Sequence, residues 1–225
     1  MRIWFKFLLW PFMVLLGIGL FGACAPEPAT QTNVYQQRTI SLNAKENGPA
    51  FARINLEVPI AYDTLLQWVH YSDCNSCHRY KHRFLSKRNC LHQENGWFDP
   101  LTCVDTLARL TITHELESTG LTAFDTAEVR GFVFSKNRDR AARKAPPLVW
   151  LASRLEKIDG TNFIILDYNQ IGPDRTSSSR IEARSVINGR DVIFEFESGT
   201  VSYPDFRTHA YHTLRTLAIQ SVPES

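Results

Sequence analysis

The feature that most limits the fold of this chain is the dipeptide Asn188-Gly189 between two apolar runs. Val186-Ile187 precedes it and Val192-Ile193 follows it. Asn and Gly both accept positive φ, which a two-residue turn between antiparallel strands requires. The next segment, Phe194 to Glu197 (FEFE), alternates as a strand with one buried and one solvated face does. The sequence therefore predicts an antiparallel hairpin at this turn.

Further patterned segments extend the sheet beyond this hairpin. The predicted strands are Arg38–Ala44, Phe51–Val58, Leu107–Leu116, Leu148–Ile158, Thr161–Gln170, Arg180–Ile187 and Val192–Glu197. The predicted helices are Tyr62–His70, part of Thr122–Arg143, and Tyr203–Ile219. A run of such strands closed by a helix favours an α+β fold, and we expect a single domain over residues 37–222. In this domain we expect helices to cover an antiparallel β-sheet.

Two of the predicted helices carry local signals. Thr122 and Asp125 are alternative N-caps for the first, and Gly131 leaves open whether that helix is kinked or in two pieces. Tyr203–Ile219 is expected to be amphipathic and to close the domain. Its buried stripe is expected at Phe206, Ala210, Leu214, Leu217 and Ala218.

The order of a strand, an NGR turn, the strand VIFEFES and then PDFRTHAYHTLRTLAI resembles the ending of PsbP-like domains. An early strand that ends in Val-Pro, here Leu56 to Pro59, also resembles that pattern. The resemblance implies an antiparallel sheet covered by a C-terminal helix. It also implies an exported or lipid-anchored protein that acts by binding, often without enzymatic activity. It carries no catalytic residues over to this chain.

The N-terminus predicts export. Arg2 and Lys6 precede an apolar run, Leu8–Ala23, which ends in small residues before Cys24. This resembles a bacterial lipoprotein signal, in which the cysteine becomes the diacylated first residue of the mature chain. We therefore expect a signal peptide at 1–23, lipidation at Cys24 and a flexible tether at 24–36. A retained signal anchor, or secretion with cleavage elsewhere, is the alternative.

Processing of this kind removes the net charge of the chain. The sequence has 25 Lys and Arg against 23 Asp and Glu, and loss of Arg2 and Lys6 makes the numbers equal. A formally neutral chain gives no reason to expect a nucleic-acid partner. The expected partners are the membrane, through the lipid, and an unknown envelope protein or small ligand. The expected location is a bacterial membrane, with the domain facing the periplasm or the cell surface.

The remaining cysteines lie in one block over residues 72–103. They are Cys74, Cys77, Cys90 and Cys103. In an oxidising compartment an even set of this kind favours disulfides. We expect two disulfides that staple this block as an insertion in the fold. Four cysteines allow three pairings, and the sequence does not choose among them.

The same block contains a complete haem-attachment motif, Cys74-Asn75-Ser76-Cys77-His78. The alternative hypothesis is therefore a membrane-tethered c-type cytochrome with haem on Cys74, Cys77 and His78. The mature chain has no methionine for the sixth ligand, since Met1 and Met13 both lie in the signal. The histidines that remain for this role are His82, His92 and His114. The even set of cysteines favours disulfides, and we expect no cofactor.

Two further interpretations of the cysteines are weaker. A zinc ribbon needs a second close cysteine pair, unless His78 or His92 replaces one ligand, and export favours oxidation over metal binding. A thioredoxin-like motif needs a strand followed by a helix in a βαβ unit, which the sequence does not predict. We therefore expect no metal site.

No catalytic constellation is predicted. His209 and His212 share a helix face, but no acidic partner is evident, so we expect them to flank the buried stripe. His114 is interpreted as a strand residue. Asp167 and Asp174 are candidates to line a cleft, without any specified chemistry.

Two basic clusters, residues 78–88 and 136–144, are candidates to bind an anionic partner such as a glycan, a lipid headgroup or an acidic protein. The neutrality of the mature chain favours a balanced, solvated surface instead. The sequence as a whole predicts a lipid-anchored binding or accessory protein of the cell envelope without an evident catalytic site.

Overall fold

The computed structural model describes residues 34–45, 48–71, 78–86, 108–172, 177–199 and 205–222. The chain divides into two compact units, Met1–Val34 and Tyr35–Ser225, and only Val34 of the first is described. The predicted signal at 1–23, most of the tether and all five cysteines lie outside the described residues. Lipidation, disulfides and haem attachment therefore stay predictions.

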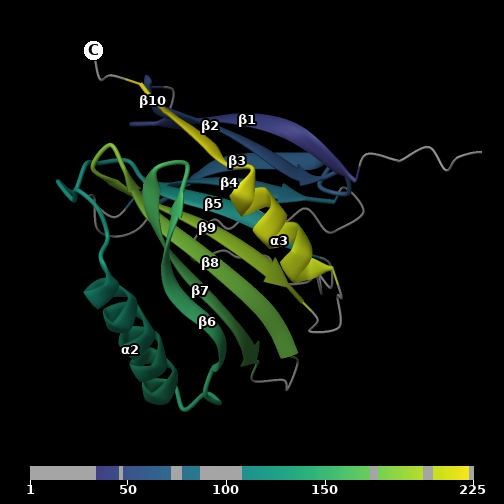
Figure 1. The fold of residues 1–225 in the computed structure, drawn as a ribbon, viewed down its shortest axis with the longest axis vertical. Coiled ribbons are helices and arrows are strands. Elements are labelled where there is room, and N and C mark those ends of the chain that lie inside the picture. Colours follow the sequence, from purple (N-terminus) through teal and green to yellow (C-terminus); the bar gives the residue numbers. More distant parts are fainter. Residues whose placement is uncertain are drawn as a thin grey trace, which may run out of the picture. The chain divides into compact units, whose positions relative to one another are not determined.

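The described part of the second unit consists of two antiparallel sheets and two helices (Figure 1). The small sheet has the order β1 (Tyr35–Asn43), β2 (Ala50–Pro59), β10 (Ala218–Ser221). The large sheet has the order β3 (Thr64–His70), β4 (Arg79–Leu85), β5 (Arg109–Glu115), β9 (Arg190–Ser198), β8 (Ser177–Ile187), β7 (Thr161–Ile171), β6 (Val149–Ile158). The helices are α2 (Thr126–Ala142) and α3 (Phe206–Arg215). The predicted α+β class, with antiparallel strands and a C-terminal helix, is confirmed.

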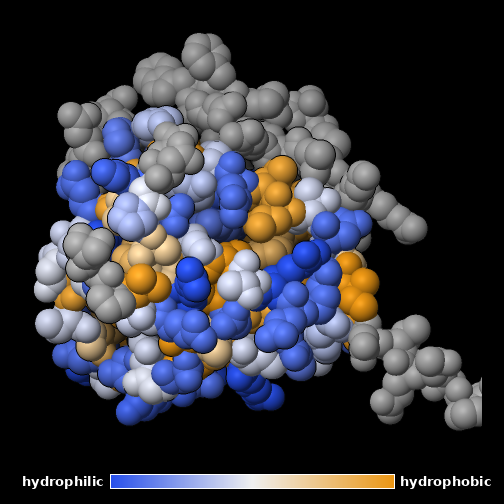
Figure 2. Space-filling model, turned by 90° about the horizontal axis from the view of Figure 1, so that it is seen from above, coloured by the Kyte–Doolittle hydropathy of each residue, from blue (hydrophilic) through white to orange (hydrophobic). Residues whose placement is uncertain are grey.

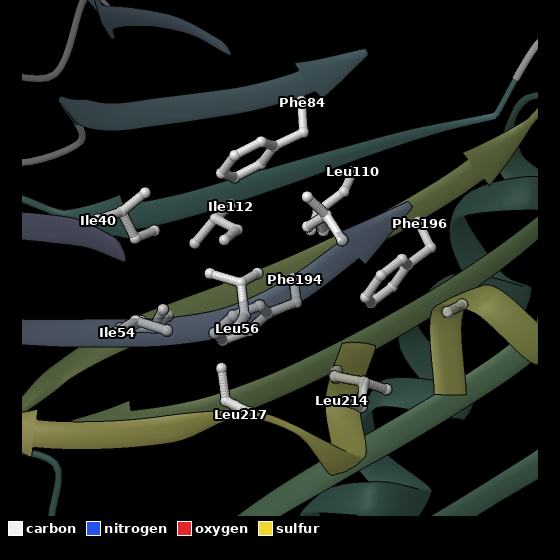
Figure 3. Packing of buried hydrophobic residues seen from close by; sticks show 14 of the residues in the cluster. Ile40, Ile54, Leu56, Phe84, Leu110, Ile112, Phe194, Phe196, Leu214 and Leu217 are labelled. Atoms are coloured by element: carbon white, nitrogen blue, oxygen red, sulfur yellow. The ribbon is translucent and has the colours of Figure 1, made fainter. Parts of the chain in front are cut away.

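The main core lies between the two sheets. We call the face of the large sheet that packs against the small sheet and α3 the inner face. Phe84 and Phe194 of the inner face lie opposite Ile54 and Leu56 of β2 (Figure 3). Leu214 of α3 packs into the same cluster. Each of these side chains is almost completely buried, so their burial supplies most of the force that holds the layers together.

The opposite, outer face of the large sheet is covered differently. Helix α2 packs there through Val129, against Ile164 and Leu166 of β7 and Val186 of β8. Over β4, β5 and β9 the outer face instead carries charged and hydroxyl side chains, such as those of Lys81, Thr113 and Glu195. The outer face therefore has an apolar part beneath α2 and a polar part beside it.

Several local predictions are confirmed. The turn at Asn188-Gly189 has φ of 46° and 74°, as a hairpin turn of this type requires. Asp125 is the N-cap of α2: its carboxylate accepts from the backbone nitrogens of Ala127 (2.7 Å) and Glu128 (3.1 Å). Glu128 accepts in return from the Asp125 nitrogen, which completes a capping box. The helix continues through Gly131 without a break.

Two predicted elements differ from the structure, and one strand was missed. The segment predicted as the helix Tyr62–His70 contains the strand β3, because Trp68 pairs with Lys81 in register along the whole of β4. The last predicted helix ends earlier: α3 stops at Arg215, and Ala218–Ser221 forms β10 against β2. Strand β4 was not predicted at all. In β3 and β10, sheet pairing outweighs local helical preference.

The surface seen from above is a mosaic in which hydrophobic residues form separate groups among hydrophilic ones (Figure 2). Among the described residues neither helix has the length and apolar character needed to cross a membrane.

Candidate functional site

The residues of the haem hypothesis are mostly outside the described part of the chain. His78 is described, and its ring makes an edge contact with Tyr71 at 5.1 Å. His82 and His114, two of the three candidate sixth ligands, lie side by side on the inner face, while His92 is outside the described residues. The structure therefore does not test haem attachment, which stays the alternative.

The His82 and His114 rings are 2 % and 1 % exposed and lie 5.8 Å apart. Gln67 donates to His82 Nδ1 (3.0 Å), and His114 Nδ1 donates to the Glu115 carbonyl (3.1 Å). Burial lowers the pKa of His82 to about 3, with a contribution from His114. Burial also lowers the pKa of His114 to about 4, and Arg190 adds to that shift. Both rings are therefore neutral at neutral pH.

The histidines of α3 have partners that the sequence did not reveal. His212 Nε2 lies 2.7 Å from the Glu57 carboxylate, so the expectation of no acidic partner is wrong. Tyr35 stacks on His212 at 3.7 Å and its hydroxyl contacts His209 Nδ1 at 2.8 Å. The partners come from β1 and β2, far away in the chain. These contacts hold α3 to the small sheet.

Asp167 is also structural, and the expectation that it lines a cleft is not met. Its side chain is buried on the inner face beneath α3. The Arg207 Nε lies 3.1 and 3.2 Å from its two carboxylate oxygens, and the Tyr211 hydroxyl donates to it at 3.2 Å. Asp167 therefore anchors α3. Asp174 lies outside the described residues.

The two basic clusters, in contrast, meet on the outer face. Arg79 and Lys81 of β4 and Lys136 of α2 line one cleft of about 560 Å³, which we call the outer cleft. Its described lining residues are His70, Arg79, Lys81, Thr113, Lys136, Arg180, Glu182, Arg184, Ile193 and Glu195. The size is in the range of small-ligand sites. The pairing of β4, β5, β9 and β8 creates this cleft, because it brings residues 79–81 towards residues 180–184.

Cations outnumber carboxylates among the described residues that line the outer cleft. Five of these residues are Lys or Arg, and two are Glu. Three of the cations also pair with carboxylates outside that lining: Arg79 with Glu115, Arg180 with Glu197 and Arg184 with Asp191.

In two of the ion pairs on the wall of the outer cleft the carboxylate is the more buried partner. The side chain of Glu182 is 6 % exposed against 26 % for Lys136, and that of Asp191 is 8 % exposed against 17 % for Arg184. In these two pairs the cation faces the solvent more than its carboxylate does, whereas in the pair of Arg180 with Glu195 the carboxylate is the more exposed, at 34 % against 24 %.

Lys136 is held in place by an ion pair with Glu182 of the large sheet. Lys136 Nζ donates to Glu182 at 2.6 Å, and the Tyr168 hydroxyl donates to the same carboxylate oxygen. Lys136 and Tyr168 thus stabilise the ionised form of Glu182, whose pKa is lowered in spite of burial. A charged group that is fixed in this way loses little conformational entropy when a ligand binds.

Arg180 is fixed by two carboxylates of β9. It donates to Glu197 at 2.6 Å and to Glu195 at 3.3 Å, and Arg109 donates to Glu197 at 2.6 Å from the other side. Burial opposes ionisation of Glu197, but Arg180 and Arg109 outweigh it and lower its pKa to about 2. Burial raises the pKa of Glu195, and Arg180 opposes this shift only in part. Glu195 is therefore the weaker acid of the two.

The described residues contain no group of three or more His, Cys, Asp or Glu side chains arranged to hold a metal ion. The sequence had indicated the basic clusters, but not that they face one cleft. That arrangement depends on the strand order of the large sheet.

No protein-family model and no curated protein matches this chain. Solved structures with a similar arrangement include cyanobacterial PsbP from Synechocystis sp. PCC 6803, with 12% identity, a TM-score of 0.47 and coverage of 90% of this chain and 99% of that chain. LpqN of Mycobacterium tuberculosis, which is involved in cell envelope biogenesis, has 10% identity, a TM-score of 0.41 and coverage of 82% and 92%. A Pseudomonas aeruginosa protein of unknown function has 12% identity, a TM-score of 0.36 and coverage of 76% and 92%.

A PsbP protein is thus among the similar structures, as the strand-and-helix pattern of the C-terminal third had indicated. The PsbP-like resemblance is supported only by the presence of this protein among the similar structures. The comparison does not test the lipoprotein-type signal. At this level of identity and structural similarity we assign no ligand or activity from these proteins.

Proposed function

We propose that this chain is an exported, lipid-anchored binding protein of the cell envelope that takes an anionic ligand in the outer cleft. The observation that carries this proposal is the meeting of two basic clusters, from β4 and α2, at one cleft. The N-terminal pattern that ends at Cys24 supports the export and anchoring parts.

The chemistry of the wall favours an anion. Guanidinium and ammonium groups donate charge-assisted hydrogen bonds to phosphate and carboxylate oxygens, each worth about 1.5–3 kcal/mol. A concave wall of one dominant sign concentrates the field and raises the local concentration of an oppositely charged ligand. Arg180 and Lys136 are already oriented by Glu197 and Glu182. Little reorganisation is then needed on binding.

The same wall suits binding better than catalysis. Arginine and lysine stay protonated at neutral pH, so they orient an anion without exchanging a proton with it. Of the two carboxylates on the wall, Glu182 is held by Lys136 and Glu195 by Arg180. A binding or accessory role therefore needs no further group than those that line the cleft.

A matched ligand pair tests the binding part. We expect the mature chain to bind a hexose 6-phosphate and not the parent hexose, with a dissociation constant that rises with salt, because only the phosphate engages the cations. Calorimetric titration at several salt concentrations measures the dissociation constant for each sugar. Arg79→Gln should weaken binding about tenfold, the loss of roughly one charge-assisted hydrogen bond.

Arg53→Gln is the control for this titration, because it removes an equal charge from an exposed position on β2. Equal binding of hexose and hexose phosphate would contradict an anionic ligand, and so would equal losses in the two variants.

The anchor is tested separately. We expect Cys24→Ala to move the protein from the membrane to the soluble fraction of the cell envelope, since lipidation needs this thiol. Fractionation followed by immunodetection measures the distribution. A variant that stays with the membrane as the wild type does would rule out lipidation at Cys24.

A further inference from the structure

A second hollow continues the outer cleft past Lys136 and Arg180, which line both. It has a volume of about 220 Å³ and lies where α2 ends, and we call it the end hollow. Its described lining residues are Lys136, Asp139, Arg140, Arg143, Leu148, Tyr168, Gln170 and Arg180. The outer cleft and the end hollow are therefore adjacent, with these two cations in common.

The end hollow is also cationic. Four of its described lining residues are Lys or Arg and one is Asp. The Arg140 guanidinium donates to the carbonyls of Pro146 (2.6 and 2.9 Å) and Ile171 (2.9 Å). These acceptors are neutral, so they fix the orientation of Arg140 without cancelling its charge. Asp139 makes only a loose pair with Arg138, at 3.8 Å between exposed side chains.

The C-terminal end of α2 would by itself repel an anion, because its last carbonyls carry partial negative charge. Arg140 lies in the last turn of α2 and Arg143 is its C-cap. Both are placed to offset that charge. The end hollow thus carries positive charge where the helix alone would not supply it.

We propose that the ligand of this surface carries at least two anionic groups, one bound in the outer cleft and one in the end hollow. This proposal rests on the proposed function. Lys136 and Arg180 lie between the two sites and are braced by Glu182 and Glu197. A phosphate chain or a multiply phosphorylated headgroup has this chemistry. Once the first group is bound, the second binds as an intramolecular event and the affinity increases.

The test compares orthophosphate with tripolyphosphate by calorimetric titration of the mature chain. The phosphate count gives tripolyphosphate an advantage of about threefold and its higher charge adds to this, whereas bridging of two sites raises the ratio by 10² or more. We expect the larger ratio for the wild type. Arg79→Gln affects the outer cleft and Arg143→Gln the end hollow, so either variant should reduce the ratio towards threefold. Arg53→Gln on β2 should leave it unchanged.

The outcomes separate the two proposals. A wild-type ratio near threefold overturns the two-group ligand but leaves anion binding intact. A ratio that falls in Arg79→Gln and not in Arg143→Gln also overturns it, because the end hollow then contributes nothing. If neither anion binds to the wild type at all, the proposed function fails together with this inference.

A vesicle experiment distinguishes a lipid headgroup from a soluble polyanion as the source of the anionic groups. It uses the mature chain with Cys24→Ala, which carries no lipid of its own. Sedimentation with cardiolipin vesicles that tripolyphosphate reverses supports a two-phosphate lipid headgroup. Tripolyphosphate binding without sedimentation supports a soluble polyanion. Sedimentation that tripolyphosphate does not reverse contradicts binding at this surface.

Discussion

At the scale of single residues, the neutral imidazoles of His82 and His114 are the most pH-sensitive part of the inner core. Each ring is almost fully buried, and protonation of both would place two positive charges 5.8 Å apart. Arg190 adds a third positive charge close to His114. The other groups at the pair are neutral, namely the Tyr80 ring and the Gln67 amide. The hydrogen bond from His114 to the Glu115 carbonyl favours protonation, but it offsets the effect of burial only in part.

We therefore expect the domain to lose stability in mild acid. Both folded pKa values, about 3 and about 4, lie below the ordinary value of 6.5. Below pH 6.5 the unfolded chain binds protons that the folded chain does not. The free energy of unfolding is therefore highest above pH 6.5 and falls as the pH drops towards 4. Between pH 8 and pH 5 the loss is about 2 kcal/mol per histidine.

Urea unfolding at the two pH values measures this loss. His114→Phe keeps a ring beside Tyr80 and removes one titrating group, so we expect it to halve the dependence on pH. An unchanged dependence in this variant would mean that the acid sensitivity arises elsewhere.

At the scale of elements, helix α3 is held by polar contacts as well as by its apolar stripe. Asp167 of β7 accepts from Arg207 and Tyr211, and both donors belong to α3. We expect Asp167→Asn to cost about 1–3 kcal/mol, because a buried charge-assisted acceptor is replaced by a neutral one. Hydrogen exchange should accelerate in α3 before it does in the large sheet.

Asp139→Asn is the matched control for this prediction, since Asp139 is exposed on α2 and makes only a loose ion pair. If Asp167→Asn left the unfolding free energy and the exchange of α3 unchanged, the polar anchoring of α3 would be refuted.

Predictability also varies from element to element. Strand β9 follows from alternation and its pairing with β8 from the Asn188-Gly189 turn, while β7 follows from an apolar run at residues 163–166 that is buried on both faces of the sheet. Strand β4 (RYKHRFL) alternates as well, with Arg79, Lys81 and Arg83 on its outward side, but it is interpreted from the sequence as part of a basic cluster and not as a strand. Two of these cations line the outer cleft.

At the scale of the whole molecule, a chain with nearly balanced charges, 25 Lys and Arg against 23 Asp and Glu, has a cleft lined mostly by cations. Formal neutrality favoured a balanced surface, but in two ion pairs at the cleft the carboxylates, Glu182 and Asp191, lie deeper than the cations that they pair with. This separation cannot be predicted from composition. It depends on strand order, which brings β4 and β8 together across β5 and β9.

The outer cleft was predictable only in its parts. The sequence showed clusters at 78–88 and 136–144, and a patterned strand that begins near Arg180. It did not show that Lys136 pairs with Glu182 or that Arg180 bridges Glu195 and Glu197. Those pairings set the depth and the charge of the cleft. They arise from contacts between elements that are distant in the chain.

The most direct measurement of the central claim is the location of a bound anion in crystals of the mature chain. Tungstate mimics phosphate and is located by its anomalous scattering. We expect its strongest site in the outer cleft, within hydrogen-bond distance of Arg79 or Lys136, and loss of that site in Arg79→Gln but not in Arg53→Gln. Tungstate bound only at surfaces away from the outer cleft, with the cleft itself empty, would contradict the account.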